Sequence, residues 1–122
     1  MDKQTKYIVA KFVKFITNEL QIDIPFKVNF TTKRTEDLTT YAYYDPNTHN
    51  IKVYCKDRGL ADVLRSLAHE FVHHHQNQTG QLQKPAPDVG GPIEDGANAI
   101  AGQLVKKFGY QHPDFPIYTK TL

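Results

Sequence analysis

Four histidines lie between residues 69 and 75, in the stretch "AHEFVHHHQ". His69 and His73 are four residues apart, so on a helix they would lie one turn apart on the same side. Two imidazoles in that arrangement can both place a nitrogen about 2.0–2.1 Å from one zinc ion. The helical angle aims His74 and His75 elsewhere, and we expect these two to pack or be solvated. The spacing therefore predicts one aligned pair of zinc ligands.

Glu70 completes the pattern H-E-x-x-H between the two histidines. It follows His69 too closely in sequence to join the same coordination sphere comfortably. A carboxylate there can instead take the proton of a water molecule activated by the metal. A solvated polar helix face would show the same residues, so a third ligand has to decide between the two interpretations. Catalytic zinc usually takes three protein ligands and leaves one position open.

The segment "GGPIEDGANAIAG" offers the third ligand. Pro92 suits the first position of a helix. The residues expected to form the core-facing stripe of that helix are Ile93, Ala97, Ile100, Ala101, Leu104 and Phe108. Glu94 lies at the edge of this stripe, where an unpaired carboxylate would be costly unless it met a cation. Asp95 points away and can favour the helix dipole, so the dipole alone does not explain Glu94. We therefore predict Glu94 as a metal ligand.

The order of these ligands resembles that of the gluzincin metallopeptidases. Glu94 follows His73 by 21 residues (94 − 73), whereas a metzincin would carry a histidine where this chain has Thr79. The run Glu94-x-x-Ala97-Asn98-x-Ile100-Ala101 is similar to the second motif of ImmA/IrrE-type peptidases. Ile100 stands where that family usually has phenylalanine. The motifs cover roughly residues 60 to 105, and the remainder matches only in the order of its elements.

This resemblance implies a zincin-like fold, one zinc ion per chain, and hydrolysis of peptide bonds in a peptide or protein substrate. Glu70 would then be the general base, while Asn98 would help to orient a ligating histidine. An edge strand above the metal would form the substrate rim; the residues expected there are Thr40, Tyr41, Ala42, Tyr43 and Tyr44. The loop Thr79–Gly91 would line the side that receives the leaving product.

A second donor to the tetrahedral intermediate is needed besides zinc. The sequence leaves several candidates open, namely Tyr110, His112, Tyr118 and the tyrosines at 41, 43 and 44. For each of them, a surface or packing role is an equally good interpretation.

Helices and strands of the expected lengths surround these motifs. The residues that predict an amphipathic N-terminal helix are Ile8, Val9, Phe12, Val13, Phe15, Ile16 and Leu20. Alternating apolar residues predict strands over 26–30 and 51–55. A third strand is expected in "TTYAYYDPNTHN", with a turn at Asp45-Pro46-Asn47. His49 belongs to this hairpin turn and is expected to be exposed. Gly59 opens a helix that runs to about Gly80, and the last helix closes at Gly109. The order α-β-β-β-α-α predicts an α+β fold with a small three-stranded mixed sheet and a hairpin.

The tail 110–122 contains Pro113 and Pro116 and is expected to be extended. Two roles remain open for it. The tail could lie along the substrate groove and hold the enzyme latent, as the C-terminal segment of minimal gluzincins can. It could equally cover part of the core with Phe115, Ile117 and Tyr118.

The composition of the 122-residue chain is that of one soluble globular domain spanning residues 1–122, with 39% hydrophobic and 23% charged residues. A net charge of +2 gives no reason to expect a nucleic-acid partner. Lys11 and Lys14 interrupt the N-terminal apolar run, and no stretch approaches the roughly 20 apolar residues of a membrane span. Cys55, the single cysteine, cannot form an internal disulfide and is expected to be buried. We expect a cytoplasmic monomer that binds no membrane.

Two further functions stay open on the sequence alone. The domain could be a zinc-binding interaction module without turnover, although a purely structural site has no use for Glu70. It could also be an interaction domain without metal, in which the H-E-x-x-H pattern arose by chance.

Overall fold

Three helices and three strands follow one another in the predicted order α-β-β-β-α-α. The computed structural model describes residues 1–34, 40–80 and 92–122, with side chains in the last range from Glu94 onward. The elements are α1 (Lys3–Glu19), β1 (Lys27–Thr31), β2 (Ala42–Asp45), β3 (Asn50–Tyr54), α2 (Leu60–Gln78) and α3 (Pro92–Gln111). The fold class is therefore α+β, as the sequence predicts.

The strands form one mixed sheet in the order β1-β3-β2. β1 pairs with β3 in parallel, with Val28 opposite Ile51, and β2 pairs with β3 in antiparallel register, with Tyr44 opposite Ile51. The hairpin between β2 and β3 turns at Asp45, whose carboxylate accepts a hydrogen bond from the backbone N–H of Asn47 at 2.8 Å. This topology leaves β2 at an edge among the described strands.

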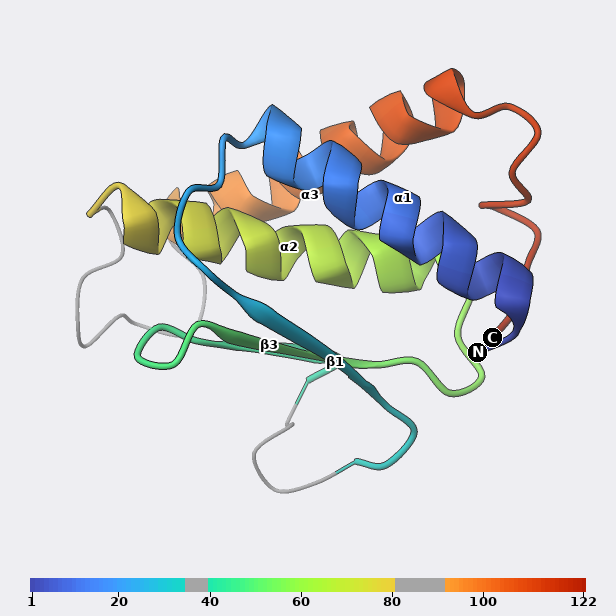
Figure 1. The fold of residues 1–122 in the computed structure, drawn as a ribbon, viewed down its shortest axis with the longest axis horizontal. Helices are drawn as coiled ribbons and strands as arrows, with labels where there is room; N and C mark the ends of the chain where they lie inside the picture. The colour runs from blue at the N-terminus through green and yellow to red at the C-terminus, as the bar shows by residue number, and fades with distance from the viewer. Residues whose placement is uncertain (35–39, 81–91) are drawn as a thin grey trace.

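α2 is the central layer, with the sheet on one side and with α1 and α3 on the other (Figure 1). Its apolar stripe, Leu64, Leu67, Ala68 and Phe71, is fully buried. Both sides of this helix are covered, so several of its polar side chains are buried as well, among them Glu70, His73 and His74. Each of these must find a polar partner or face an internal opening, because an unsatisfied buried polar group is costly.

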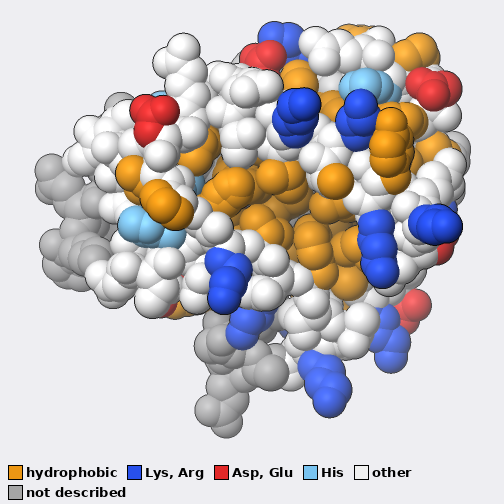
Figure 2. Space-filling model, viewed as in Figure 1, with side chains coloured by type: hydrophobic (Ala, Val, Ile, Leu, Met, Phe, Trp, Pro, Cys, Tyr) orange, Lys and Arg blue, Asp and Glu red, His pale blue; other side chains and the backbone are white. Residues whose placement is uncertain are grey.

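Apolar side chains also remain visible in the hollow between α1 and β1, surrounded by lysine and arginine side chains (Figure 2). Partly buried residues of both elements, such as Val13 and Val28, pack against the core. Within the described ranges, no helix has the length and apolar character needed to cross a membrane.

Two predictions about α3 were wrong. Ile100 is 38% exposed and does not belong to the core stripe, which is formed by Ala97, Ala101 and Phe108. At 100° per residue, Ile100 lies 60° from Ala97, on the side away from Ala101, so the predicted stripe was too wide on that side. The helix also continues past Gly109 and ends at Gln111.

The tail after α3 is a series of turns and is not the extended segment that we predicted. Ile117 is buried in the core, and Phe115 packs edge-on against Tyr7 of α1. The backbone of the tail then pairs with the segment at the start of α2. The N–H of Leu60 donates to the backbone carbonyl of Lys120 at 2.8 Å, and the N–H of Leu122 donates to the backbone carbonyl of Arg58 at 2.8 Å. The contacts of the tail therefore match the covering role.

Candidate metal centre

The helices α2 and α3 bring two imidazoles and one carboxylate to a single point. The Nε2 atoms of His69 and His73 lie 3.0 Å apart. The carboxylate of Glu94 meets both rings, with Oε2 at 3.0 Å from His69 Nε2 and Oε1 at 2.8 Å from His73 Nε2. The spacing of four residues sets the first pair, and the inward-facing position of Glu94 on the first turn of α3 supplies the third group, as the sequence predicts.

These atoms of His69, His73 and Glu94 form a triangle, the metal triangle, whose size fits a metal ion. Ligand atoms about 2.05 Å from a tetrahedral ion are roughly 3.3 Å from one another, slightly more than the 2.8–3.0 Å found here. Burial, followed by the neighbouring His73, lowers the pKa of His69, which favours the neutral imidazole that metal binding requires. His69, His73 and Glu94 could therefore hold a metal ion.

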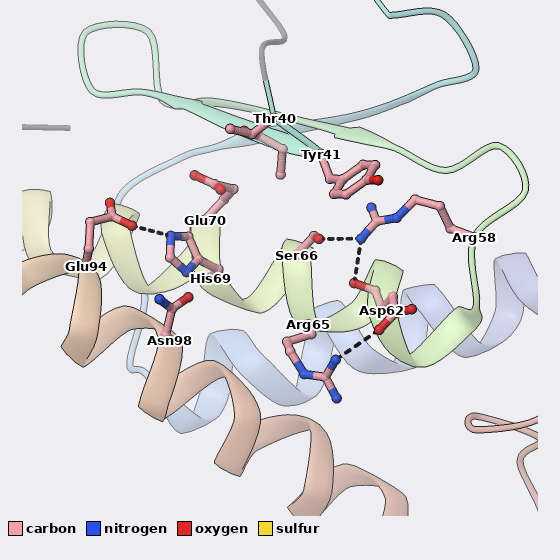
Figure 3. Close-up of a pocket in the computed structure, with 11 residues that line it drawn as sticks. Thr40, Tyr41, Arg58, Asp62, Arg65, Ser66, His69, Glu70, Glu94 and Asn98 are labelled. Atoms are coloured by element: carbon pink, nitrogen blue, oxygen red, sulfur yellow. Dashed lines mark hydrogen bonds and ion pairs between the residues drawn. The ribbon is translucent and has the colours of Figure 1, made fainter. Parts of the chain in front are cut away.

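Two amide side chains lie beside the imidazoles. Nδ1 of His73 lies 2.8 Å from Oε1 of Gln76. An amide oxygen can only accept, so Nδ1 carries the hydrogen and Nε2 keeps a free lone pair toward the triangle. Asn98 lies beside His69 on the neighbouring helix α3 (Figure 3), and its amide partly opposes the lowering of the His69 pKa. Gln76 was not predicted, although its position three residues after His73 places it on the same side of α2.

Glu70 lies beside the triangle and is only 6% exposed. Burial, together with the negative charge of Glu94, raises the pKa of Glu70 to about 8. A cation held by the triangle would oppose both effects, because it would neutralise Glu94 and favour the ionised form of Glu70. The donor set and the neighbouring carboxyl group thus agree with a positively charged ligand.

A cleft of about 310 Å³ opens between β2 and α2. Figure 3 shows Thr40 and Tyr41 above it, His69, Glu70 and Glu94 near one end, and Arg58 near the other. The remaining side chains that line it are Ala42, Asp62, Arg65, Ser66 and Asn98. The metal triangle therefore stands beside a space that a second molecule can enter.

The predicted substrate rim is correct for only part of its length. Thr40, Tyr41 and Ala42 line the cleft. Tyr44 is instead buried and bonded to His74, while Tyr43 lies on the other face of the strand and is 39% exposed. Alternation of side chains along β2 places Tyr43 and Tyr44 on opposite faces. The predicted product-side loop falls largely in residues 81–91, which lie outside the described residues.

The other histidines are held away from the metal triangle. His74 is fully buried; its Nδ1 accepts from the hydroxyl of Tyr44 at 2.7 Å, and its Nε2 donates to the carbonyl of Ile24 at 3.2 Å. His49, predicted to be exposed, is half-buried with its ring 5.2 Å from that of His74. His75 is half-buried near the end of α2. The separation of one aligned pair from the bystanders is as predicted.

The three candidate donors in the C-terminal region lie away from the cleft. Tyr110 and Tyr118 are 75% and 63% exposed, and His112 stacks on Phe115. Sixteen residues of α3 separate Tyr110 from Glu94, which corresponds to about 24 Å of helix. Tyr41 is the tyrosine that lines the cleft among the described residues, and it packs against Arg58, with 4.4 Å between the guanidinium carbon and the ring centroid.

Comparison of the chain with protein-family models, curated proteins and solved structures gives no match.

Proposed function

We propose that this protein is a zinc-dependent metallopeptidase of the gluzincin type. One observation supports this function above the others: a three-ligand group for a metal and a buried carboxyl group both border the same open cleft. A structural metal site is normally closed by four protein ligands, whereas a catalytic site keeps one position open.

Zinc is the metal that best suits two imidazole nitrogens and one carboxylate oxygen. Bound there, it would supply Lewis-acid chemistry: a lower pKa for a water molecule and polarisation of a substrate carbonyl. The histidines and Glu94 would hold the ion, while Gln76 and Asn98 would keep the imidazoles in the required orientation.

Glu70 would move the proton. Its carboxylate borders the cleft next to the ligands, so it can accept a proton from the attacking water and deliver it to the leaving amine. The edge of β2 would bind an extended peptide by adding it as a further strand, with Thr40, Tyr41 and Ala42 along its path. Tyr41 lines the cleft beside Arg58, at the end away from the metal ligands (Figure 3).

The substitution Glu70→Gln tests this function directly. It removes the base and keeps the size of the side chain, so we expect a loss of peptide hydrolysis of about 1,000-fold or more. Zinc content, measured by atomic emission, should stay near one per chain because the three ligands remain. A digest of a peptide library with wild-type protein beside this variant measures the loss and identifies the cleaved sequences.

Asp95→Asn is the matched control, because Asp95 is an exposed acid next to Glu94 and outside the cleft lining. It should leave both zinc content and hydrolysis unchanged. Equal hydrolysis by wild-type protein and Glu70→Gln would contradict the mechanism. A zinc-loaded protein that cleaves nothing in the library would favour the binding module without turnover, and a protein that retains no zinc would favour the interaction domain without metal.

A further inference from the structure

The end of the cleft opposite the metal triangle carries an anchored cation, Arg58. Its guanidinium donates to the backbone carbonyl of Tyr54 at 2.7 Å, to that of Asp62 at 3.1 Å and to the hydroxyl of Ser66 at 2.8 Å. Tyr41 covers one face of the group at 4.4 Å. These contacts come from β3, the edge region of β2, and α2, so Arg58 is fixed relative to both walls of the cleft (Figure 3).

The positive charge of Arg58 has no carboxylate partner among the described residues. The three acceptors that it contacts are neutral oxygens. The nearby carboxylate of Asp62 is paired with Arg65, which donates to Oδ1 at 3.0 Å. A half-buried guanidinium that no carboxylate contacts is costly, and that cost falls when an anion enters the cleft beside it.

Arg58 also keeps donors for such an anion. A guanidinium has five N–H groups, and the bonds to described residues occupy three of them. Both hydrogens on Nη2 are used, so the remaining donors are Nε–H and one Nη1–H. A carboxylate oxygen that accepts from one of them makes a charge-assisted hydrogen bond. A second cation adds to the field, because Arg34 lies 5.2 Å from the centroid of the same Tyr41 ring.

We propose that this end of the cleft is a subsite for a substrate carboxylate, and that Arg58 determines the specificity for it. The identity of the ligand as a peptide rests on the proposed function. The carboxylate can come from an acidic side chain or from the free C-terminus of a peptide, since both present the same two oxygens.

The position of Arg58 limits where this carboxylate stands in the substrate. Ser66, which anchors the guanidinium, precedes His69 by three residues, or about 4.5 Å along the helix axis. An extended peptide advances about 3.3 Å per residue. The carboxylate therefore belongs to a residue within about three positions of the scissile bond, on one side of it only.

Binding, measured separately from turnover, tests the subsite. Fluorescein-labelled peptides that differ only as Glu against Gln at one position are titrated by anisotropy into zinc-loaded Glu70→Gln protein. We expect one position at which the Glu peptide binds about 10- to 100-fold more tightly than its Gln partner, as for a charge-assisted hydrogen bond. Amidated peptides with an internal Glu, beside neutral peptides with a free C-terminus, distinguish the two sources of the carboxylate.

Arg58→Gln, introduced into the same background, should reduce the Glu-to-Gln ratio to about 2 or less. The matched control Lys106→Gln, which removes an exposed lysine of α3 outside the cleft lining, should change the ratio less than threefold. A general folding defect lowers binding of both peptides and leaves their ratio unchanged. If Arg58→Gln does not fold, Arg58→Lys and a titration of the original protein from 0.05 to 0.5 M NaCl replace it, and the ratio should fall in each.

An equal affinity for Glu and Gln peptides at every position would overturn the subsite, and so would a ratio that Arg58→Gln leaves unchanged. This outcome is distinct from a failure of the proposed function. Hydrolysis of neutral peptides by wild-type protein that Glu70→Gln abolishes would support the metallopeptidase even if no preference for acidic peptides existed. A clear Glu preference without any hydrolysis would support the subsite alone.

Discussion

His73 and His74 are neighbours in the sequence, and both are buried in α2, yet their surroundings differ in kind. Nε2 of His73 faces a carboxylate and a second imidazole beside an open cleft. Both nitrogens of His74 are bonded to neutral partners, the hydroxyl of Tyr44 and the carbonyl of Ile24. The 100° turn between consecutive helical residues separates a candidate metal ligand from a structural side chain.

The difference shows which observation marks a functional histidine. Burial alone does not, because His74 is more deeply buried than His73. The hydrogen-bond partners of the ring nitrogens distinguish the two residues. In His74 a hydroxyl and a carbonyl complete the hydrogen-bonding capacity of a neutral imidazole, so neither nitrogen can bind a further ligand. A carboxylate and a second imidazole within 3.0 Å, in contrast, crowd three electron-rich groups around one point that a cation would stabilise.

The largest expected effect is on metal affinity. We expect His73→Ala to weaken zinc binding by more than about 100-fold, beyond the 10- to 100-fold typical of residues that only orient a ligand. His74→Ala should retain the metal with little change in affinity. Competition with a zinc-binding dye measures both variants. Weaker binding in His74→Ala than in His73→Ala would reverse the assignment of the two residues.

Gln76→Ala should have an intermediate effect. It keeps all three ligands but removes the acceptor that fixes the Nδ1–H tautomer of His73, so we expect zinc affinity to fall about 10- to 100-fold. The same dye competition applies. Gln78→Ala is the control, since Gln78 lies on the same helix and bonds instead to backbone groups of Gln21, Asp23 and Ile24. An affinity unchanged by Gln76→Ala would show that packing alone orients the ring.

The smallest effect is expected on the structural side of the comparison. Tyr44→Phe removes the hydroxyl that donates to His74 and accepts from Asn77 at 3.0 Å. We expect the free energy of unfolding to fall by about 1–3 kcal/mol, with zinc affinity unchanged. Urea denaturation measures this loss, and Tyr110→Phe on the exposed part of α3 should cost less than about 0.5 kcal/mol. If Tyr44→Phe lost zinc without any loss of stability, the surroundings of His73 and His74 would be functionally coupled.

Local spacing made much of this molecule predictable. The element order follows from periods of two and of 3.6 residues, and the pair His69 and His73 follows from one helical turn. Glu94 could be predicted because an inward-facing acid needs a positive partner. Ile100 was assigned wrongly to the core because the stripe was drawn from hydrophobicity, while the position of α3 against α2 sets the buried face.

Residues that act through distant partners could not be predicted. Arg58 becomes part of the cleft only because β2 brings Tyr41 to its guanidinium, and His74 is satisfied by groups 30 and 50 residues away in sequence. The tail illustrates the same limit: two prolines favour an extended chain, but pairing with the loop before α2 and burial of Ile117 fold it into turns.

The three ligands belong to elements of unequal protection against hydrogen exchange. His69 and His73 lie in the middle of α2, which is covered on both sides, so its amides should exchange only when the whole domain opens. Glu94 is the third residue of α3, in a first turn whose N–H groups have no partner within the helix. We therefore expect a bound ion to slow exchange mainly at Gly96, Ala97 and Asn98, whose amides close that turn, and to be released through detachment of Glu94 while both histidines stay in place.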